Sequence, residues 1–166
     1  MGNIAFAEWI QIFLILVLVY LAYFDLRTFR LPDVITLPLI MAALFFNGLS
    51  KDGFVSFQDS LLGAILGYSS LWLLNFLYRS YKKQDGIGMG DAKLLAALGA
   101  WLGWVALPGI LLLASISGLL GGVFWLQWNK QNHRSAFPFG PFLAIAGIIE
   151  LLWPQILQNL LLSKLA

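Results

Sequence analysis

Long apolar runs separated by short polar turns dominate this sequence of 166 residues and constrain its fold more than any other feature. Hydrophobic residues make up 60% of the chain and charged residues 11%, less than half the share of about 25% that soluble domains carry. This small number of charged residues cannot cover the apolar side chains with a hydrated surface. Most of the chain must therefore lie in lipid. Backbone polar groups in hydrocarbon hydrogen-bond within their own segment, which favours helices. The sequence therefore predicts an all-α, polytopic membrane protein.

Six apolar runs approach or reach the roughly 20 residues that a membrane span requires. They cover about residues 4–24, 34–49, 61–78, 92–107, 109–128 and 139–162, with Pro108 dividing the fourth run from the fifth. Glu8 stands where a signal peptide would carry basic residues, so we expect the first run to be a permanent span. No linker marks off a second unit. We predict one transmembrane domain over residues 1–166, with about six helices.

Basic residues show which ends of the runs share a side of the membrane. Eight of the ten fall in the turns after the first, third and fifth runs or at the start of the fourth: Arg27, Arg30, Arg79, Lys82, Lys83, Lys93, Lys130 and Arg134. Loops rich in Lys and Arg stay cytoplasmic. This side is therefore predicted to face the cytoplasm, with both termini on the opposite side.

Two aspartates occupy cytoplasmic ends of predicted spans. Asp25 ends the first run, where a carboxylate faces the negative end of the helix dipole at a cost of a few tenths to about 1 kcal/mol. Asp91 opens the fourth run after a glycine-rich turn. Taken singly, Asp25 is explained as the start of a solvated loop that pairs with an arginine, and Asp91 as a helix N-cap. Together they are more informative, because the basic residues place both at one membrane depth.

A pair of neighbouring carboxylates can hydrolyse a peptide bond. Two such groups within a few ångströms cannot both ionise readily, so they share a proton. The ionised member takes a proton from the attacking water, while the protonated member polarises the carbonyl oxygen. This chemistry needs no metal, cofactor or covalent intermediate. Cysteine is absent and His133 is the one histidine, which leaves little for a thiol nucleophile or a histidine-rich metal site.

Two further features lie inside the apolar runs. Glu150 falls within the sixth run and is either a buried helix contact or a group within reach of water, with catalysis a minor alternative. Glycines recur at four-residue spacing at positions 63 and 67 and at positions 118 and 122. Such spacing lets helices approach closely. We expect packing inside one chain, with dimerisation as the weaker alternative.

Three stretches resemble the motifs of the type IV prepilin peptidases, membrane aspartic proteases with a Gly-x-Gly-Asp signature. They are FDLRTFRLPDVIT at 24–36, GMGDAKLLAALGAWLG at 88–103 and FPFGPF at 137–142, in the family's order and on the predicted cytoplasmic side. The resemblance covers about residues 20–147. It implies a six-helix endopeptidase with Asp25 and Asp91 as catalytic residues, supported by the motif residues Asp33, Gly88, Gly90, Lys93, Pro138 and Gly140.

The resemblance also implies a substrate and a location. Such enzymes remove the short basic leader of type IV prepilins or prepilin-like pseudopilins, proteins of pilus and type II secretion systems. The implied partners are a substrate with its own transmembrane helix and the lipid bilayer of the bacterial inner membrane, with the active site toward the cytoplasm. No nucleic acid, metal or cofactor is expected. Many members add a cysteine-rich N-terminal region that accompanies N-methylation, so this cysteine-free chain is predicted to be a peptidase without methyltransferase activity.

Two other functions stay open at this point, and so does the oligomeric state. A small ion or proton-coupled transporter subunit would also explain carboxylates at the membrane edge and close-packing glycines. It would be expected to place polar groups near the bilayer midplane rather than at one face. The third hypothesis is a catalytically silent scaffold for pilus assembly.

Overall fold

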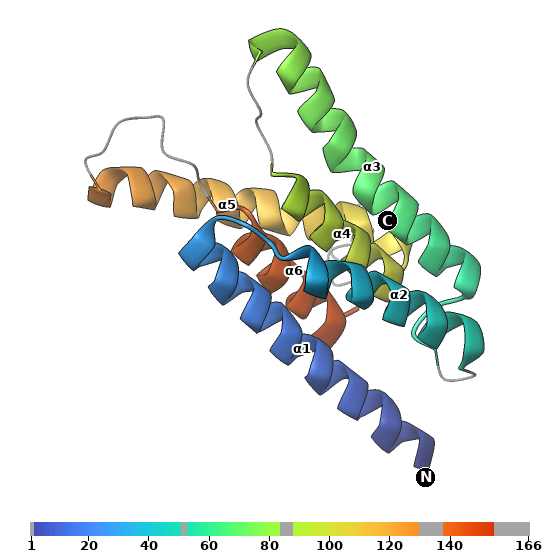
Figure 1. Cartoon of the computed structure of the whole chain (residues 1–166). Helices are drawn as coiled ribbons and strands as arrows, with labels where there is room; N and C mark the ends of the chain where they lie inside the picture. The colour runs from blue at the N-terminus through green and yellow to red at the C-terminus, as the bar shows by residue number, and fades with distance from the viewer. Residues whose placement is uncertain (1, 51–52, 84–87, 130–137, 155–166) are drawn as a thin grey trace, which may run out of the picture.

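The computed structural model describes residues 2–50, 53–83, 88–129 and 138–154 (Figure 1). Within these ranges the chain forms helices and no strands, which confirms the predicted all-α class. The elements are α1 (Gly2–Thr28), α2 (Asp33–Leu49), α3 (Phe57–Lys82), α4 (Met89–Leu102), the short 3-10 helix η1 (Trp104–Ala106), α5 (Leu107–Asn129) and α6 (Gly140–Leu152).

Length and surface both indicate a membrane protein. Three segments are long and apolar enough to cross a bilayer, namely Phe6–Thr28, Phe57–Lys82 and Trp104–Val123, and two shorter apolar helices cover Asp33–Leu49 and Gly140–Leu152. Large apolar side chains point outward along the long helices, with Leu16 63%, Leu77 58% and Leu119 70% exposed. Apolar exposure on this scale is stable in lipid and not in water. The protein is therefore embedded in the membrane.

Two predicted boundaries are wrong. α4 ends at Leu102 because Gly103 adopts a φ of +83°, and η1 then leads into α5 at Leu107. Pro108, predicted to divide two spans, lies in the first turn of α5, where a missing N–H costs no hydrogen bond. α6 ends at Leu152 rather than at residue 162, because the residue before Pro154 is disfavoured in a helix. Residues 155–162 lie outside the described residues.

α4 lies at the centre of the bundle although it is too short to cross a membrane. Its 14 residues span about 21 Å, against a hydrocarbon core of about 30 Å, and ten of them are buried. α2, α3 and α6 pack around it, while α6 also contacts α1 and α5. A Cβ on Gly63 would collide with the carbonyl of Gly99, and one on Gly67 would lie 2.6 Å from the Leu95 oxygen. The predicted close approach at these two α3 glycines is confirmed within the chain.

Buried hydrogen bonds tie α2 and α3 to the C-terminal end of α4. Asn47 Nδ2 and Ser60 Oγ donate to the carbonyl oxygen of Ala100 at 2.9 and 2.6 Å, and Asn47 Oδ1 accepts from the Phe54 N–H at 2.9 Å. The last carbonyls of a helix have no partner within it, so these side chains satisfy a group that would otherwise be buried unpaired. We call Asn47, Ser60 and the Ala100 carbonyl the Asn47 cluster.

Candidate active site

Asp25 is a buried residue in the last turn of α1. The helix ends at Thr28, and Phe29 follows in the left-handed region with a φ of 53°, where its N–H donates to the Asp25 backbone carbonyl at 2.8 Å. Only 5% of Asp25 is exposed. The nearby Arg27 guanidinium lies over the Tyr23 ring, 5.3 Å from its centroid. Asp25 is therefore not the solvated start of a loop.

Asp91 is buried in the first turn of α4. Gly88 is the N-cap residue of this helix, and the Asp91 N–H donates to the Gly88 carbonyl at 3.1 Å. The N-cap residue makes no side-chain capping bond, and Asp91 is 8% exposed. The N-cap explanation of Asp91 is therefore wrong. The N-cap position belongs to Gly88, so Asp91 lies three residues inside the helix.

Gly140 brings the two carboxyl groups together. A Cβ added to this first residue of α6 would lie 2.6 Å from Asp25 Oδ2 and 3.3 Å from Asp91 Oδ1. These two oxygens are consequently no farther apart than 5.9 Å, the sum of the two distances. The missing side chain of Gly140 is what leaves room for both groups. We call Asp25 and Asp91 the aspartate pair.

Helix termini shape the electrostatics around the aspartate pair. Asp91 lies in the first turn of α4 and Gly140 begins α6, so the positive N-terminal ends of two helices meet the carboxyl groups. The Gly140 N–H donates to the Asp25 carboxylate. Within the described part of the chain, Asp25 Oδ2 is a buried oxygen with no hydrogen-bond partner. Such an acceptor is suited to bind a shared proton or a water molecule.

The connection between α1 and α2 packs against the start of α4, the helix that carries Asp91. A Cβ on Gly90 would lie 3.0 Å from Leu31 Cβ, so the connection rests directly on this glycine. Asp33, in the first turn of α2, accepts a hydrogen bond from Lys93 Nζ at 2.6 Å. Two residues that the family resemblance named separately as supporting residues therefore form an ion pair with each other.

Comparison with known proteins identifies the family. The model of the type IV leader peptidase family matches residues 12–123, a stretch that contains both aspartates and most of the bundle. The chain belongs to this family. Its N-terminal aspartate motif and its Gly-x-Gly-Asp motif thus lie within the part that the family model describes.

Curated relatives bear the name prepilin leader peptidase/N-methyltransferase. One from Aeromonas hydrophila is 49% identical over 137 residues, covering 82% of this chain and 47% of the relative. Others, from Dickeya chrysanthemi and Pseudomonas aeruginosa, are 44% and 46% identical over 135 and 123 residues, with 81% and 74% of this chain and 47% and 42% of the relative covered. The chain spans about half the length of the curated relatives it matches. No solved structure matches it significantly.

The remaining motif residues of this leader peptidase family chain lie near the starts of α2, α4 and α6. Gly88 opens α4, and a Cβ there would lie 3.5 Å from Asp91 Oδ2, an ordinary contact. Pro138 is buried just before α6. Gly88, Gly90, Pro138 and Gly140 thus all lie at or next to helix starts, and Gly88 and Gly140 approach the carboxyl groups, while Asp33 and Lys93 join α2 to α4.

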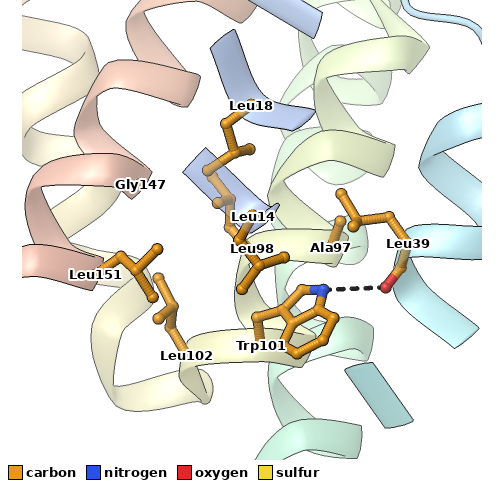
Figure 2. A pocket seen from close by; sticks show the side chains of 9 residues that line it. All are labelled: Leu14, Leu18, Leu39, Ala97, Leu98, Trp101, Leu102, Gly147 and Leu151. Carbon is orange, nitrogen blue, oxygen red and sulfur yellow. Dashed lines mark hydrogen bonds between the residues drawn. The ribbon is translucent and has the colours of Figure 1, made fainter. Parts of the chain in front are cut away.

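Apolar side chains line a small cavity in the interior of the bundle (Figure 2). Leu18, Leu98 and Gly147 each stand seven residues from Asp25, Asp91 and Gly140 on their own helices, which is about 10 Å along the axis. They border a cavity of about 10 Å³ whose other walls are Leu14, Leu39, Ala97, Trp101, Leu102 and Leu151. Trp101 turns its Nε1 away to donate to the Leu39 carbonyl at 3.0 Å. A layer of apolar side chains therefore follows the aspartate pair toward the interior of the bundle.

Glu150, which was singled out in the sequence, does not join the pair. His133 lies outside the described residues. Glu150 is buried near the other end of α6, with 4% exposed. The sequence did not predict the Asn47 cluster or the packing of the α1–α2 connection against Gly90. Asn47 and Ser60 were visible as polar residues in or next to apolar runs, which is a signal for buried hydrogen bonds, whereas nothing in the sequence linked Gly90 to Leu31.

Proposed function

We propose that this chain is a membrane aspartic endopeptidase that removes the short basic leader of type IV prepilins or prepilin-like pseudopilins. The observation that carries the proposal is the contact of both buried carboxyl groups with Gly140, which holds their oxygens within 5.9 Å. The family assignment supports the same chemistry. The names of the relatives serve only as a guide to the substrate, because this chain spans about half of their length.

In the proposed reaction the aspartate pair holds one proton. The ionised carboxylate removes a proton from a water molecule as its oxygen attacks the scissile carbonyl carbon, and the protonated partner donates to the carbonyl oxygen. A tetrahedral gem-diol forms. In the second half, a carboxyl proton passes to the peptide nitrogen, a gem-diol hydroxyl returns its proton to the pair, and the C–N bond breaks. The pair ends with one proton, ready for the next turnover.

Burial explains why this chemistry suits the site. The apolar layer next to the pair and the buried side chains of α4 exclude bulk water. Each electrostatic contact of the pair therefore acts in a medium of low polarity. The N-termini of α4 and α6 favour negative charge on the pair. Gly140 allows close approach of the backbone to the carboxyl groups, Gly88 provides the N-cap residue of α4, and Gly90 with Leu31 positions the connection. Asp33 and Lys93 act as positioning residues, and Pro138 sets the start of α6.

The proposed location is the bacterial inner membrane, with the pair toward the cytoplasm. The basic residues Arg27, Arg30 and Lys93 lie in or next to the elements that carry the pair, as the positive-inside rule requires of a cytoplasmic face. A substrate with its own apolar helix would lie in the same bilayer and present its leader at this depth. We further propose that residues 1–166 act as one domain and cleave without N-methylating the product.

The transporter hypothesis receives no support from the described residues. An ion path would continue from the aspartate pair toward the midplane through polar groups. The next layer instead consists of Leu18, Leu98 and Gly147, around a cavity with apolar walls.

The direct test is cleavage in proteoliposomes that contain the chain and a prepilin-like substrate. We expect one new N-terminus, at the junction of leader and apolar helix, identified without a methyl group by mass spectrometry. Asp25→Ala and Asp91→Ala should insert normally and not cleave. Intact substrate with the wild type, across several leader-bearing proteins, would contradict the proposal.

Topology can be tested on the same membranes. The chain contains no cysteine, so a single Ser80→Cys or Ser56→Cys variant gives one labelling site at each end of α3. An impermeant thiol reagent should label Ser56→Cys from outside right-side-out membrane vesicles and Ser80→Cys only after the vesicles are opened. The reverse pattern would contradict a cytoplasmic site.

A further inference from the structure

Asn75 is a buried polar residue in a mostly apolar part of α3. Its neighbours Leu74, Phe76 and Leu77 are each more than half exposed, whereas Asn75 is 8% exposed. Burying an amide costs free energy unless it has a partner, and polar residues inside membrane helices usually face the interior of the bundle and serve function. The position of Asn75 along α3 indicates which part of the bundle it serves.

The face of α3 that carries Asn75 packs against α4 (Figure 1). Its buried residues recur every three or four positions, and they are Ser60, Gly63, Gly67, Leu71 and Asn75. Ser60 donates to the Ala100 carbonyl near the C-terminal end of α4. Asn75 Nδ2 donates to Met89 Sδ at 4.0 Å, at the N-terminal end of α4. Two polar residues on one face of α3 therefore contact opposite ends of the same helix.

The first turn of α4 is held only weakly by its own residues. It follows Gly88 and contains Gly90, and glycine has more backbone freedom than any other residue. The N-cap residue makes no side-chain capping bond. Asp91 belongs to this turn, so a movement of the turn also moves the Asp91 carboxyl group.

Neighbouring elements hold this turn from two sides. On the side of α2, the connection packs through Leu31 against Gly90. On the side of α3, Asn75 contacts Met89, two residues before Asp91. A thioether sulfur is a weak acceptor, so we expect this contact to affect the position of the turn more than the stability of the protein.

We propose that Asn75 is a positioning residue for the reaction proposed above. It holds the first turn of α4 through Met89 and thereby keeps the Asp91 carboxyl group close to that of Asp25. The effect on rate rests on the proposed peptidase function. Without the contact the glycine-containing turn has more freedom, and the two carboxyl groups spend less time at the separation that the reaction needs.

The first test is steady-state cleavage of a prepilin-like substrate by the full chain in proteoliposomes. Asn75→Leu replaces the amide by a hydrocarbon of similar shape and should lower kcat at least fivefold. Met89→Leu removes the sulfur at similar volume and should lower kcat at least twofold. KM should stay within a factor of two of the wild type in both, because positioning acts on the reaction rather than on substrate binding. The double variant should lose no more than Asn75→Leu alone, because both changes remove the same contact.

Hydrogen exchange tests the position of the turn without any substrate. In lipid nanodiscs, Asn75→Leu should speed amide exchange in residues 89–92 severalfold and leave residues 98–102 unchanged, because local opening follows the lost contact. Ser60→Ala is the matched control, since it removes the contact at the other end of α4. It should speed exchange in residues 98–102, leave residues 89–92 unchanged and keep the wild-type kcat per folded molecule.

The two measurements separate this inference from the peptidase function. If the wild type cleaves no leader substrate, the proposed function fails, while hydrogen exchange still decides whether Asn75 holds the turn. Unchanged exchange at residues 89–92 in Asn75→Leu would overturn the proposal. A wild-type kcat in either single variant, or additive losses in the double variant, would also overturn it. If Asn75→Leu does not insert, Met89→Leu decides the question in both measurements, because exchange of Met for Leu is usually tolerated.

Discussion

The two ends of α4 treat buried polar groups in opposite ways. At the C-terminal end, Asn47 and Ser60 converge on the Ala100 carbonyl, and the hydrogen bonds measure 2.6 to 3.4 Å. At the N-terminal end, two carboxyl groups crowd against Gly140, and Asp25 Oδ2 is buried with no hydrogen-bond partner among the described residues. One end uses polarity to join helices. The other keeps an acceptor unsatisfied at a cost in stability.

This difference separates a structural polar cluster from a reactive one. A fully bonded cluster gains from every member, whereas an unsatisfied buried oxygen costs about 1–3 kcal/mol or more. Proteins retain such groups where function needs them. Substitutions at the pair should therefore reduce activity and spare stability, while substitutions in the Asn47 cluster should do the reverse.

The largest effect is expected from neutralising either member of the aspartate pair. Asp25→Asn or Asp91→Asn removes the proton exchange on which the proposed reaction depends, and general acid–base groups contribute about 10²–10⁴-fold to rate. We expect cleavage to fall at least about 100-fold, with the thermal unfolding midpoint equal to or above that of the wild type. The measurement is single-turnover cleavage in proteoliposomes.

Asp59→Asn is the control for this prediction. Asp59 lies in the first turn of α3, where its carboxylate accepts a hydrogen bond from the Trp104 indole at 3.0 Å. This position is at the end of α4 opposite the aspartate pair. Its substitution should leave cleavage intact. A pair variant that cleaves within a factor of a few of the wild type would remove the distinction between the two ends.

The next largest effect is expected from a single methyl group at Gly140. In Gly140→Ala the new Cβ would lie 2.6 Å from Asp25 Oδ2, so the carboxyl groups must separate or α6 must shift. We expect at least a tenfold loss of cleavage. Gly88→Ala is the matched control, since its Cβ meets Asp91 Oδ2 at 3.5 Å without a clash. Equal losses in the two variants would show that crowding at Gly140 is not what matters.

Much of this arrangement followed from the sequence because a bilayer imposes simple rules. Apolar runs predicted the six α-helices of the described residues, and basic residues predicted that Asp25 and Asp91 lie at one membrane depth. The close approach at Gly63 and Gly67 was also predicted, because a missing side chain has few other uses inside a span. The partner of those glycines was not predicted, since hydropathy carries no information about which helices are neighbours.

The failures have local physical causes. Pro108 was interpreted as a break between spans, yet the first turn of a helix tolerates proline and the break lies at Gly103. The contact of Gly140 with both aspartates depends on how α6 packs against α1 and α4. A sequence motif named this glycine, but only the packed helices explain why a side chain is excluded there.

A smaller effect, on stability alone, is expected in the Asn47 cluster. Ser60→Ala removes a 2.6 Å hydrogen bond to Ala100 and should lower the free energy of unfolding by about 1 kcal/mol, the usual net value of one such bond. Ser80→Ala is the matched control, because Ser80 is exposed and donates to the Phe76 carbonyl of its own helix. Cleavage per folded molecule should match the wild type in both. A selective loss of cleavage in Ser60→Ala would show that the two ends of α4 are coupled.

The smallest effect is expected at the Asp33–Lys93 ion pair, which joins α2 to α4 beside the aspartates. Its side chains are 55% and 24% exposed, and exposed ion pairs contribute about 0–1 kcal/mol. Asp33→Asn and Lys93→Gln should each reduce cleavage less than tenfold. The double variant should lose less than the two single losses combined, because both remove the same interaction. If one single variant instead abolished cleavage at unchanged stability, that residue would act on the substrate itself, and the reactive end of α4 would extend beyond the two buried carboxyl groups to its solvent-exposed rim.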